Sequence, residues 1–331
     1  MGHVYRSLAY ARRLEREVPN AELHFYMRDF REGIDRVRGE GFGVTVLPPR
    51  PTPENFRSGF TEHAPDLLII DTLGSSLDLI AAARERAKAI VTVDDLEPSA
   101  ADCDAVVNGI LWGTRLLPER FGRAKVFQGV EYVQLREQFA EAHAQKREIN
   151  PDVRKVLIST GGADGRGFAP QLMQALADLP VDLDVDVMAG PAHSSKERLY
   201  QEAETLSDRV RFAIVENAAD MAGYLSAADI ALITGGTVMF ESAACGTPAV
   251  IVSSYEHQVP QASWFAKQNA SLHLGYFPGE INKRVIGEAV GALATDLERR
   301  REMSAAGKGS VDGNGLERFV KIVIETFDGL S

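Results

Sequence analysis

The chain has 331 residues, 45% of them hydrophobic, and a formal net charge of −11. This length fits two domains of roughly 150 residues each better than one core. Because an acidic chain repels nucleic acid and anionic lipid, we expect neither as a main partner. The two cysteines, Cys103 and Cys245, lie far apart and outside any Cys/His cluster with metal-ligand spacing. That argues against zinc sites and disulfides, and predicts two small core residues.

The sequence also limits where the protein works and what it carries. No apolar run approaches the ~20 residues that a membrane span requires, and the first residues lack the apolar region of a signal peptide. We therefore expect a cytoplasmic protein that spans no membrane and holds no metal and no other cofactor. The sequence leaves the oligomeric state open.

A glycine and a histidine stand at the front of the chain. Gly2 precedes His3 and Arg6 follows, so His3 occupies the N-terminus of any helix that begins here. Imidazole titrates near neutrality and can take a proton from water, which makes His3 a candidate general base. The alternative is a disordered terminal histidine. Since a glycine turn that opens a helix normally follows a strand, we expect the native start upstream of Met1, unless the first sheet lacks a usual strand.

Short apolar runs alternate with longer amphipathic stretches along the rest of the chain. This alternation predicts an α/β fold, in which helices cover both faces of parallel sheets. Ligands bind beyond the carboxyl ends of the strands in such sheets. Asp71 and Asp94 stand at those ends, as candidates for a catalytic or substrate role or as loop caps. The predicted strands cover residues 67–70, 89–93, 155–159, 185–188, 230–233 and 249–252.

A polar, weakly patterned segment separates two halves. It lies between Phe139 and Asp152, and its composition is typical of a linker. We therefore predict an N-terminal domain over residues 1–140 and a C-terminal domain over 151–331. The last helix is predicted over about 315–327, with one apolar face formed by Leu316, Phe319, Val320, Val323 and Phe327.

Two glycine pairs follow predicted strands in the second half. Gly161-Gly162 makes a backbone nest for an anion, or simply a tight turn before a helix. Gly235-Gly236-Thr237 opens a helix whose first N–H groups and dipole suit a phosphate. Glu241, about one turn into that helix, can accept both hydroxyls of a ribose, or else is an acid favoured by the dipole. His257-Gln258 follows strand 249–252, where it can reach a ligand or form a polar helix cap.

Several of these segments together resemble one family. They are similar to the UDP-2,4-diacetamido-2,4,6-trideoxy-β-L-altropyranose hydrolases of pseudaminic acid biosynthesis, and to related spore-coat polysaccharide biosynthesis proteins. The family usually has Gly-Gly-Ser and Trp-Glu where this chain reads Gly-Gly-Thr-Val-Met-Phe-Glu. The matching stretches occur in the family's order and span most of the chain: Gly2 to Leu8, Asp94-Asp95-Leu96, Gly129 to Phe139 with Tyr132, Ser159 to Asp164, and Ala228 to Pro248.

The resemblance implies a glycosyltransferase B-type fold, which has two Rossmann-like domains with a cleft between them. The C-terminal domain would hold UDP, with Glu241 on the ribose and the two glycine loops near the diphosphate. The N-terminal domain would hold the sugar, and His3 would activate the water that attacks the anomeric carbon and expels UDP, without a metal. The expected substrate contacts are Arg6, Asp71, Asp94, Tyr132, His257 and Gln258.

The preferred function is therefore a nucleotide-sugar hydrolase of bacterial surface-glycan (nonulosonic acid) biosynthesis, which releases UDP and a free amino or deoxy sugar. A glycosyltransferase of the same fold would instead use the base on an acceptor hydroxyl. The Arg- and Glu-rich segment 12–17 leans toward a soluble substrate over a lipid-linked one. A non-catalytic nucleotide-sugar binder is the third alternative.

Overall fold

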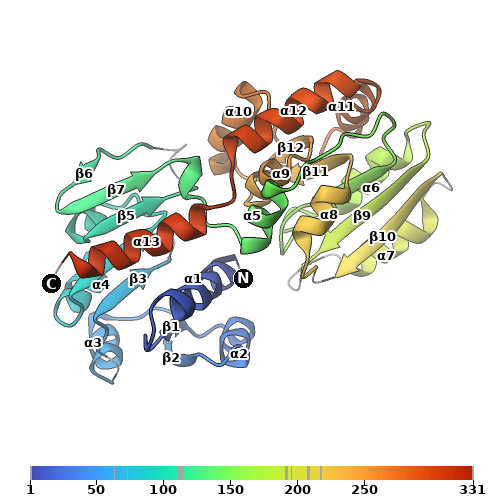
Figure 1. Cartoon of the computed structure of the whole chain (residues 1–331). Helices are drawn as coiled ribbons and strands as arrows, with labels where there is room; N and C mark the ends of the chain where they lie inside the picture. The colour runs from blue at the N-terminus through green and yellow to red at the C-terminus, as the bar shows by residue number, and fades with distance from the viewer. Residues whose placement is uncertain are drawn as a thin grey trace. The chain divides into compact units, whose positions relative to one another are not determined.

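The structure is a computed structural model that describes residues 2–62, 64–72, 74–110, 115–190, 193–194, 196–206, 209–216 and 218–329. The chain folds into two compact units, each built from strands and helices (Figure 1). Unit 1 comprises Met1–Arg136 and Asn314–Ser331, and unit 2 comprises Glu137–Gly313. The chain passes from unit 1 into unit 2 after Arg136, close to the predicted linker. The last helix belongs to unit 1, although the sequence pattern places it with the second domain.

Unit 1 contains two sheets, and no backbone pairing joins them within the described part of the chain. In the smaller sheet, β1 (His24–Arg28) runs parallel to β2 (Gly43–Leu47). The larger sheet has the order β3-β4-β5-β7-β6, with β6 antiparallel to β7. Its strands are β3 (Leu67–Ile70), β4 (Ala89–Val93), β5 (Ala105–Asn108), β6 (Arg120–Phe121) and β7 (Ala124–Gln128).

The helices of unit 1 pack against these strands through apolar stripes. The C-terminal helix α13 (Gly315–Asp328) buries most of the face predicted from its 3.6-residue period, and Phe327 of that face is half-buried. Phe319 lies 4.3 Å from the ring of Tyr10, in one cluster with Val91 and Val107 of the larger sheet. The other helices are α1 (Gly2–Glu17), α2 (Arg31–Gly39), α3 (Pro53–Glu62) and α4 (Leu77–Arg84), with short 3-10 turns at Pro98–Asp102 and Val130–Tyr132.

Unit 2 is built on one parallel sheet of six strands, in the order β10-β9-β8-β11-β12-β13. The central strands are buried along their whole length because helices cover both faces. The strands are β8 (Lys155–Ser159), β9 (Leu183–Ala189), β10 (Val210–Glu216), β11 (Ile230–Thr234), β12 (Ala249–Ser253) and β13 (Ser271–Tyr276). The helices are α5 (Glu137–Ala144), α6 (Phe168–Ala177), α7 (Lys196–Thr205), α8 (Met221–Ala227), α9 (Val238–Cys245), α10 (Val259–Lys267), α11 (Lys283–Thr295) and α12 (Leu297–Ser310), with a 3-10 turn at Glu256–Gln258.

The predicted strands and the two predicted core cysteines are confirmed. Each of the six predicted strands is present within a residue or two of its expected bounds. Cys103 and Cys245 are buried and unbridged, and burial raises the pKa of their thiols to about 12 and about 11, so both are inert core residues. Among the described residues, no helix combines the length and the apolar character needed to cross a membrane.

Candidate functional site

A histidine–carboxylate pair lies at the first turn of α1. Nδ1 of His3 is 2.6 Å from Oδ1 of Asp71, the residue that follows β3. The His3 side chain is 46% exposed, whereas that of Asp71 is 5% exposed. Within the described residues, Nδ1 is the ring nitrogen that is engaged, so the carboxylate favours the tautomer that carries its proton on Nδ1. Nε2 is then a lone-pair acceptor.

Arg6 holds the same carboxylate from the next turn of the helix. Its Nε donates to Oδ2 of Asp71 at 2.9 Å and its Nη2 donates to Oδ1 at 2.5 Å, a bidentate arrangement. Its Nη1 donates to Asp94, which follows β4. His3 and Arg6 are three residues apart on α1, and this spacing places both on the helix face that meets the strand ends.

Asp94 adopts a backbone conformation that is rare outside glycine, with φ of 49°. Its backbone N–H donates to the carbonyl of Val107 at 3.0 Å, and its Oδ1 accepts from the N–H of Ile110 at 2.8 Å. These bonds fix Asp94 to β5 and to the loop after it. The left-handed turn aims the other carboxylate oxygen, Oδ2, at Arg6.

The electrostatics of this cluster keep Asp71 ionised. Burial alone would raise the pKa of the Asp71 carboxyl, but the hydrogen bond with His3 and the charge and hydrogen bonds of Arg6 lower that pKa to about 2. Burial also raises the pKa of the Tyr10 phenol well above its ordinary value; Arg6 opposes the rise, and Asp71 and Asp94 add to it. The cluster therefore holds anionic Asp71, cationic Arg6 and a neutral phenol at physiological pH.

Two members of the cluster were not predicted from the sequence. The hydroxyl of Ser7 donates to Oδ2 of Asp71 at 3.3 Å, and the buried Tyr10 donates to Gln134 at 3.3 Å. A signal for Tyr10 was present, because positions 3, 6 and 10 share one face of a helix.

Tyr132, an expected substrate contact, lies elsewhere in unit 1. Its ring meets that of Phe127 edge to face at 5.9 Å and packs among the apolar residues beneath α13. Burial, followed by the charge of Glu131, raises the pKa of its phenol. The structure therefore brings His3, Arg6, Asp71 and Asp94 together and places Tyr132 in a hydrophobic cluster.

The two glycine loops of unit 2 leave adjacent strands. β8 pairs with β11 so that Ser159 lies opposite Ile233, and Gly161-Gly162 and Gly235-Gly236 begin two residues beyond those positions. The chain runs outward from β8 to β9 and β10 on one side, and returns through β11 on the other. The loops thus meet at the switch point of the sheet, where open α/β sheets bind ligands.

The structure requires glycine at some positions of these loops and not at others. A methyl group on Gly235 would come within 2.7 Å of the Gln258 Cβ, so packing requires glycine there. Gly161 has φ of 86°, which favours glycine for its conformation. Gly162 and Gly236 lie outside the left-handed range, and a methyl group on either would meet no atom of the described chain within 4 Å. Neither internal packing nor backbone conformation requires glycine at these two positions, and the open space beside them leaves room for a ligand to approach the backbone.

The helices that follow the two loops differ in their N-terminal caps. Asp164 accepts from the N–H groups of Phe168 and Ala169 at 2.9 and 3.0 Å, which satisfies the start of α6. Thr237, at the start of α9, makes no side-chain capping bond with any described residue. The N–H groups of Met239 and Phe240 donate to the carbonyls of Gly236 and Thr237 at 3.2 and 3.0 Å. An anion at this end of α9 would therefore meet the N–H groups of the turn before them and the positive end of the helix dipole. Glu241 is half-buried in the first turn of the same helix.

The two remaining candidates, His257 and Gln258, lie in the loop after β12 and make different contacts. Gln258 Oε1 accepts from the N–H groups of Ser254 and Tyr255 at 2.8 and 3.3 Å, so this side chain braces its own loop. His257 is exposed and stacks on Tyr255, with ring centroids 5.7 Å apart. Arg166, from the loop after β8, lies 5.2 Å from the same Tyr255 ring. The sequence did not indicate this cation–aromatic contact between the two loops.

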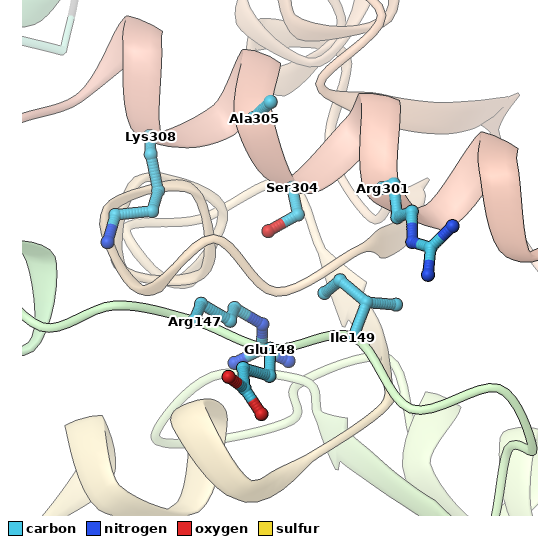
Figure 2. A pocket seen from close by; sticks show the side chains of 7 residues that line it. All are labelled: Arg147, Glu148, Ile149, Arg301, Ser304, Ala305 and Lys308. Atoms are coloured by element: carbon cyan, nitrogen blue, oxygen red, sulfur yellow. The ribbon is translucent and has the colours of Figure 1, made fainter.

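Unit 2 also has a pocket of about 470 Å³ between the segment 147–149 and α12 (Figure 2). Its cations are occupied in holding the chain together: Arg147 donates to the carbonyls of Leu225, Ser226 and Ala228, Lys308 donates to that of Gln145, and Arg301 pairs with Glu298. Ala228 precedes β11, so the pocket lies at the opposite ends of the strands from the glycine loops. Across the described residues, no group of three or more His, Cys, Asp or Glu side chains is arranged to hold a metal ion.

Comparisons with known proteins address the fold. No protein-family model matches the chain. The chain is 26% identical over 333 residues to the spore coat polysaccharide biosynthesis protein SpsG of Bacillus subtilis, an alignment that covers 99% of this chain and 95% of that protein. MurG of Acinetobacter baumannii matches with a TM-score of 0.73 at 14% identity, covering 98% of this chain and 96% of that one. A co-structure of S. aureus MnaA with UDP matches with a TM-score of 0.58 at 13% identity, covering 94% of this chain and 98% of that one.

These likenesses establish the architecture. The chain has an α/β fold of the glycosyltransferase B type, with two Rossmann-like domains, as the resemblance implies. At these identities, the similarity to the solved structures shows the fold and nothing further.

Proposed function

We propose that the protein is a nucleotide-sugar hydrolase of glycan biosynthesis, in which His3 activates water and unit 2 binds UDP. The observation that carries the proposal is the 2.6 Å contact between Nδ1 of His3 and the buried Asp71 carboxylate. A histidine whose orientation and tautomer are fixed by a carboxylate, and whose side chain is partly exposed, is a usual general base. The name of the relative SpsG supports a place in polysaccharide biosynthesis.

The nucleotide half of the proposal rests on unit 2. Gly162 and Gly236 have open space where a side chain would lie, and the N-terminus of α9 lacks a side-chain cap among the described residues. We assign the diphosphate to these two loops and the ribose hydroxyls to Glu241. The UDP in the MnaA co-structure, a protein of the same fold, supports this ligand class.

The reaction follows from the two sets of residues. Nε2 of His3 accepts a proton from water as the water oxygen bonds to the anomeric carbon. The bond between that carbon and the diphosphate oxygen breaks, and UDP leaves with the electron pair. Asp71 holds Nδ1–H and stabilises the imidazolium that forms. The dipole of α9 stabilises the negative charge on the departing diphosphate.

A glycosyltransferase remains the second candidate, because the 46% exposure of the His3 side chain leaves room for an acceptor hydroxyl in place of water. The test is incubation of the protein with candidate UDP-sugars, with and without hydroxyl acceptors. We expect UDP and free sugar in equal amounts without an acceptor, and a loss of about 10²- to 10⁴-fold in His3→Ala. UDP release that requires an acceptor would identify a transferase. UDP binding without any turnover would identify a non-catalytic binder.

A further inference from the structure

We infer that Arg6 and Asp94 are positioning residues of the acid–base centre rather than substrate contacts. In this arrangement Asp94 fixes Arg6, Arg6 fixes the Asp71 carboxylate, and Asp71 orients His3. The inference rests on the proposed function, since it assigns roles around the same base. It also revises the sequence-based interpretation, which placed both residues on the sugar.

The hydrogen bonds leave these two side chains little capacity for a substrate. Arg6 uses Nε and Nη2 on Asp71 and Nη1 on Asp94, and its side chain is 11% exposed. Asp94 uses Oδ1 on the N–H of Ile110 and Oδ2 on Arg6, and its side chain is 9% exposed. A group that contacts a sugar needs exposed donors or acceptors, and among these residues His3 is the one that is substantially exposed.

The chain of contacts begins at a rigid part of unit 1. Asp94 is held in its left-handed turn by backbone bonds to Val107 and Ile110, on and just after β5. Non-glycine residues persist in this conformation where the surrounding structure requires it, often at functional sites. Here the turn delivers a carboxylate to Arg6. The bidentate grip of Arg6 then leaves the Asp71 carboxylate one orientation, in which Oδ1 meets Nδ1 of His3.

The net charge of the cluster changes when the base takes a proton. Two carboxylates face one guanidinium, so the net charge is minus one while His3 is neutral and becomes zero when His3 takes a proton. The charged and titratable groups around His3 in unit 1 are Arg6 and Tyr10 on α1, Asp71 after β3 and Asp94 after β4. Replacing Asp94 by asparagine would leave a net positive charge after proton uptake, which disfavours that uptake.

The principal test is Asp94→Asn, whose amide oxygen can still accept from Ile110. We expect kcat to fall about ten- to a hundredfold, as for other residues that orient a reactive histidine, with the KM for the UDP-sugar within about twofold of wild type. The acidic limb of the kcat/KM profile should move to lower pH, because the base loses a neighbouring negative charge. The matched control is Asp104→Asn, which removes another arginine-paired carboxylate of unit 1 with a 10% exposed side chain. The control should leave kcat and the acidic limb unchanged.

A second variant separates charge from orientation. Arg6→Lys keeps the cation but loses the bidentate grip on Asp71, so kcat should fall while the acidic limb stays in place. This variant carries the test if Asp94→Asn does not fold. A KM raised tenfold or more in either variant, with kcat and the acidic limb unchanged, would overturn the inference. Arg6 and Asp94 would then be substrate contacts.

A measurement without turnover keeps the inference distinct from the proposed function. The nitrogen NMR signals of the neutral His3 imidazole should place its proton on Nδ1 in wild type and show a weaker preference for that tautomer in Asp94→Asn, whether or not any UDP-sugar is hydrolysed. If wild type releases no UDP from any UDP-sugar, the proposed function fails. If the tautomer preference of His3 is the same in both proteins, the positioning role of Asp94 fails.

Discussion

The candidate sites of the two units are built from different parts of the chain: side chains in unit 1 and backbone in unit 2. Unit 1 gathers charged side chains at the ends of β3 and β4, and its strands are divided between two sheets. Unit 2 has one continuous six-stranded sheet, and its candidate site consists mainly of backbone: two glycine loops and a helix start. Side chains can move protons, whereas backbone N–H groups can only bind. Under the proposed function, bond cleavage belongs to unit 1 and nucleotide binding to unit 2, so substitutions in one unit should spare the function of the other.

The largest expected effect comes from Asp71→Asn. The amide keeps the shape of the carboxylate but can present an N–H to Nδ1 of His3, which favours the wrong tautomer. We expect kcat to fall about 10³- to 10⁴-fold, while the affinity for UDP, measured by calorimetry, stays unchanged. A loss of UDP affinity as large as the loss of kcat would show that the two units do not divide catalysis and nucleotide binding between them.

Acid should weaken unit 1 before unit 2. The pKa of Asp71 is about 2 in the folded chain, against an ordinary value of 3.8, so its stabilising contribution is present above about pH 4 and is lost as the pH falls through about 2. This difference is worth about 2 kcal/mol. Hydrogen exchange should show that α1 and β3 lose more protection between pH 5 and pH 2.5 than β8 and β11.

The control for the acid experiment is the Asp71→Asn protein, in which the pH dependence of α1 and β3 should shrink to that of unit 2. If both units lose protection equally in wild type, acid lability does not distinguish them.

The smallest expected effect comes from Gly236→Ala. A methyl group there has room within the chain but would occupy the space assigned to a phosphate. We expect UDP to bind about tenfold more weakly, with an unchanged midpoint of thermal unfolding. Gly309→Ala on α12 is the matched control, because its methyl group would also meet nothing within 4 Å. If both variants bind UDP with equal affinity, the diphosphate does not bind at this loop.

The sequence predicted the buried strands more reliably than the edge strands. β4, β11 and β12 are buried at every position, and their continuous apolar runs identify them. β10, at the edge of its sheet, is buried at its first position and half-buried or exposed at the others, and it was not among the predicted strands. The residues at the ends of β3 and β4 were found for the same reason, since a polar residue after an apolar run marks a carboxyl end.

The partners of those residues were harder to predict. No local pattern states that Arg6 bridges Asp71 and Asp94, because those positions are 65 and 88 residues away and the contact depends on how α1 packs. Gln258 looked like a ligand contact but braces its own loop, and sequence alone does not separate the two uses of an amide. The apolar stripe of α13 identified a helix that must be covered, without identifying which unit covers it.

The return of α13 to unit 1 affects the order in which the protein is made. Unit 2 is one uninterrupted stretch of chain, so every residue it needs has been synthesised before α13 begins. Unit 1 is started first, yet its core lacks Leu316, Phe319 and Val320 until residues 314–329 have left the ribosome. The half that carries the charged cluster is therefore the later one to complete, and unit 2 can fold first even though its residues are translated second.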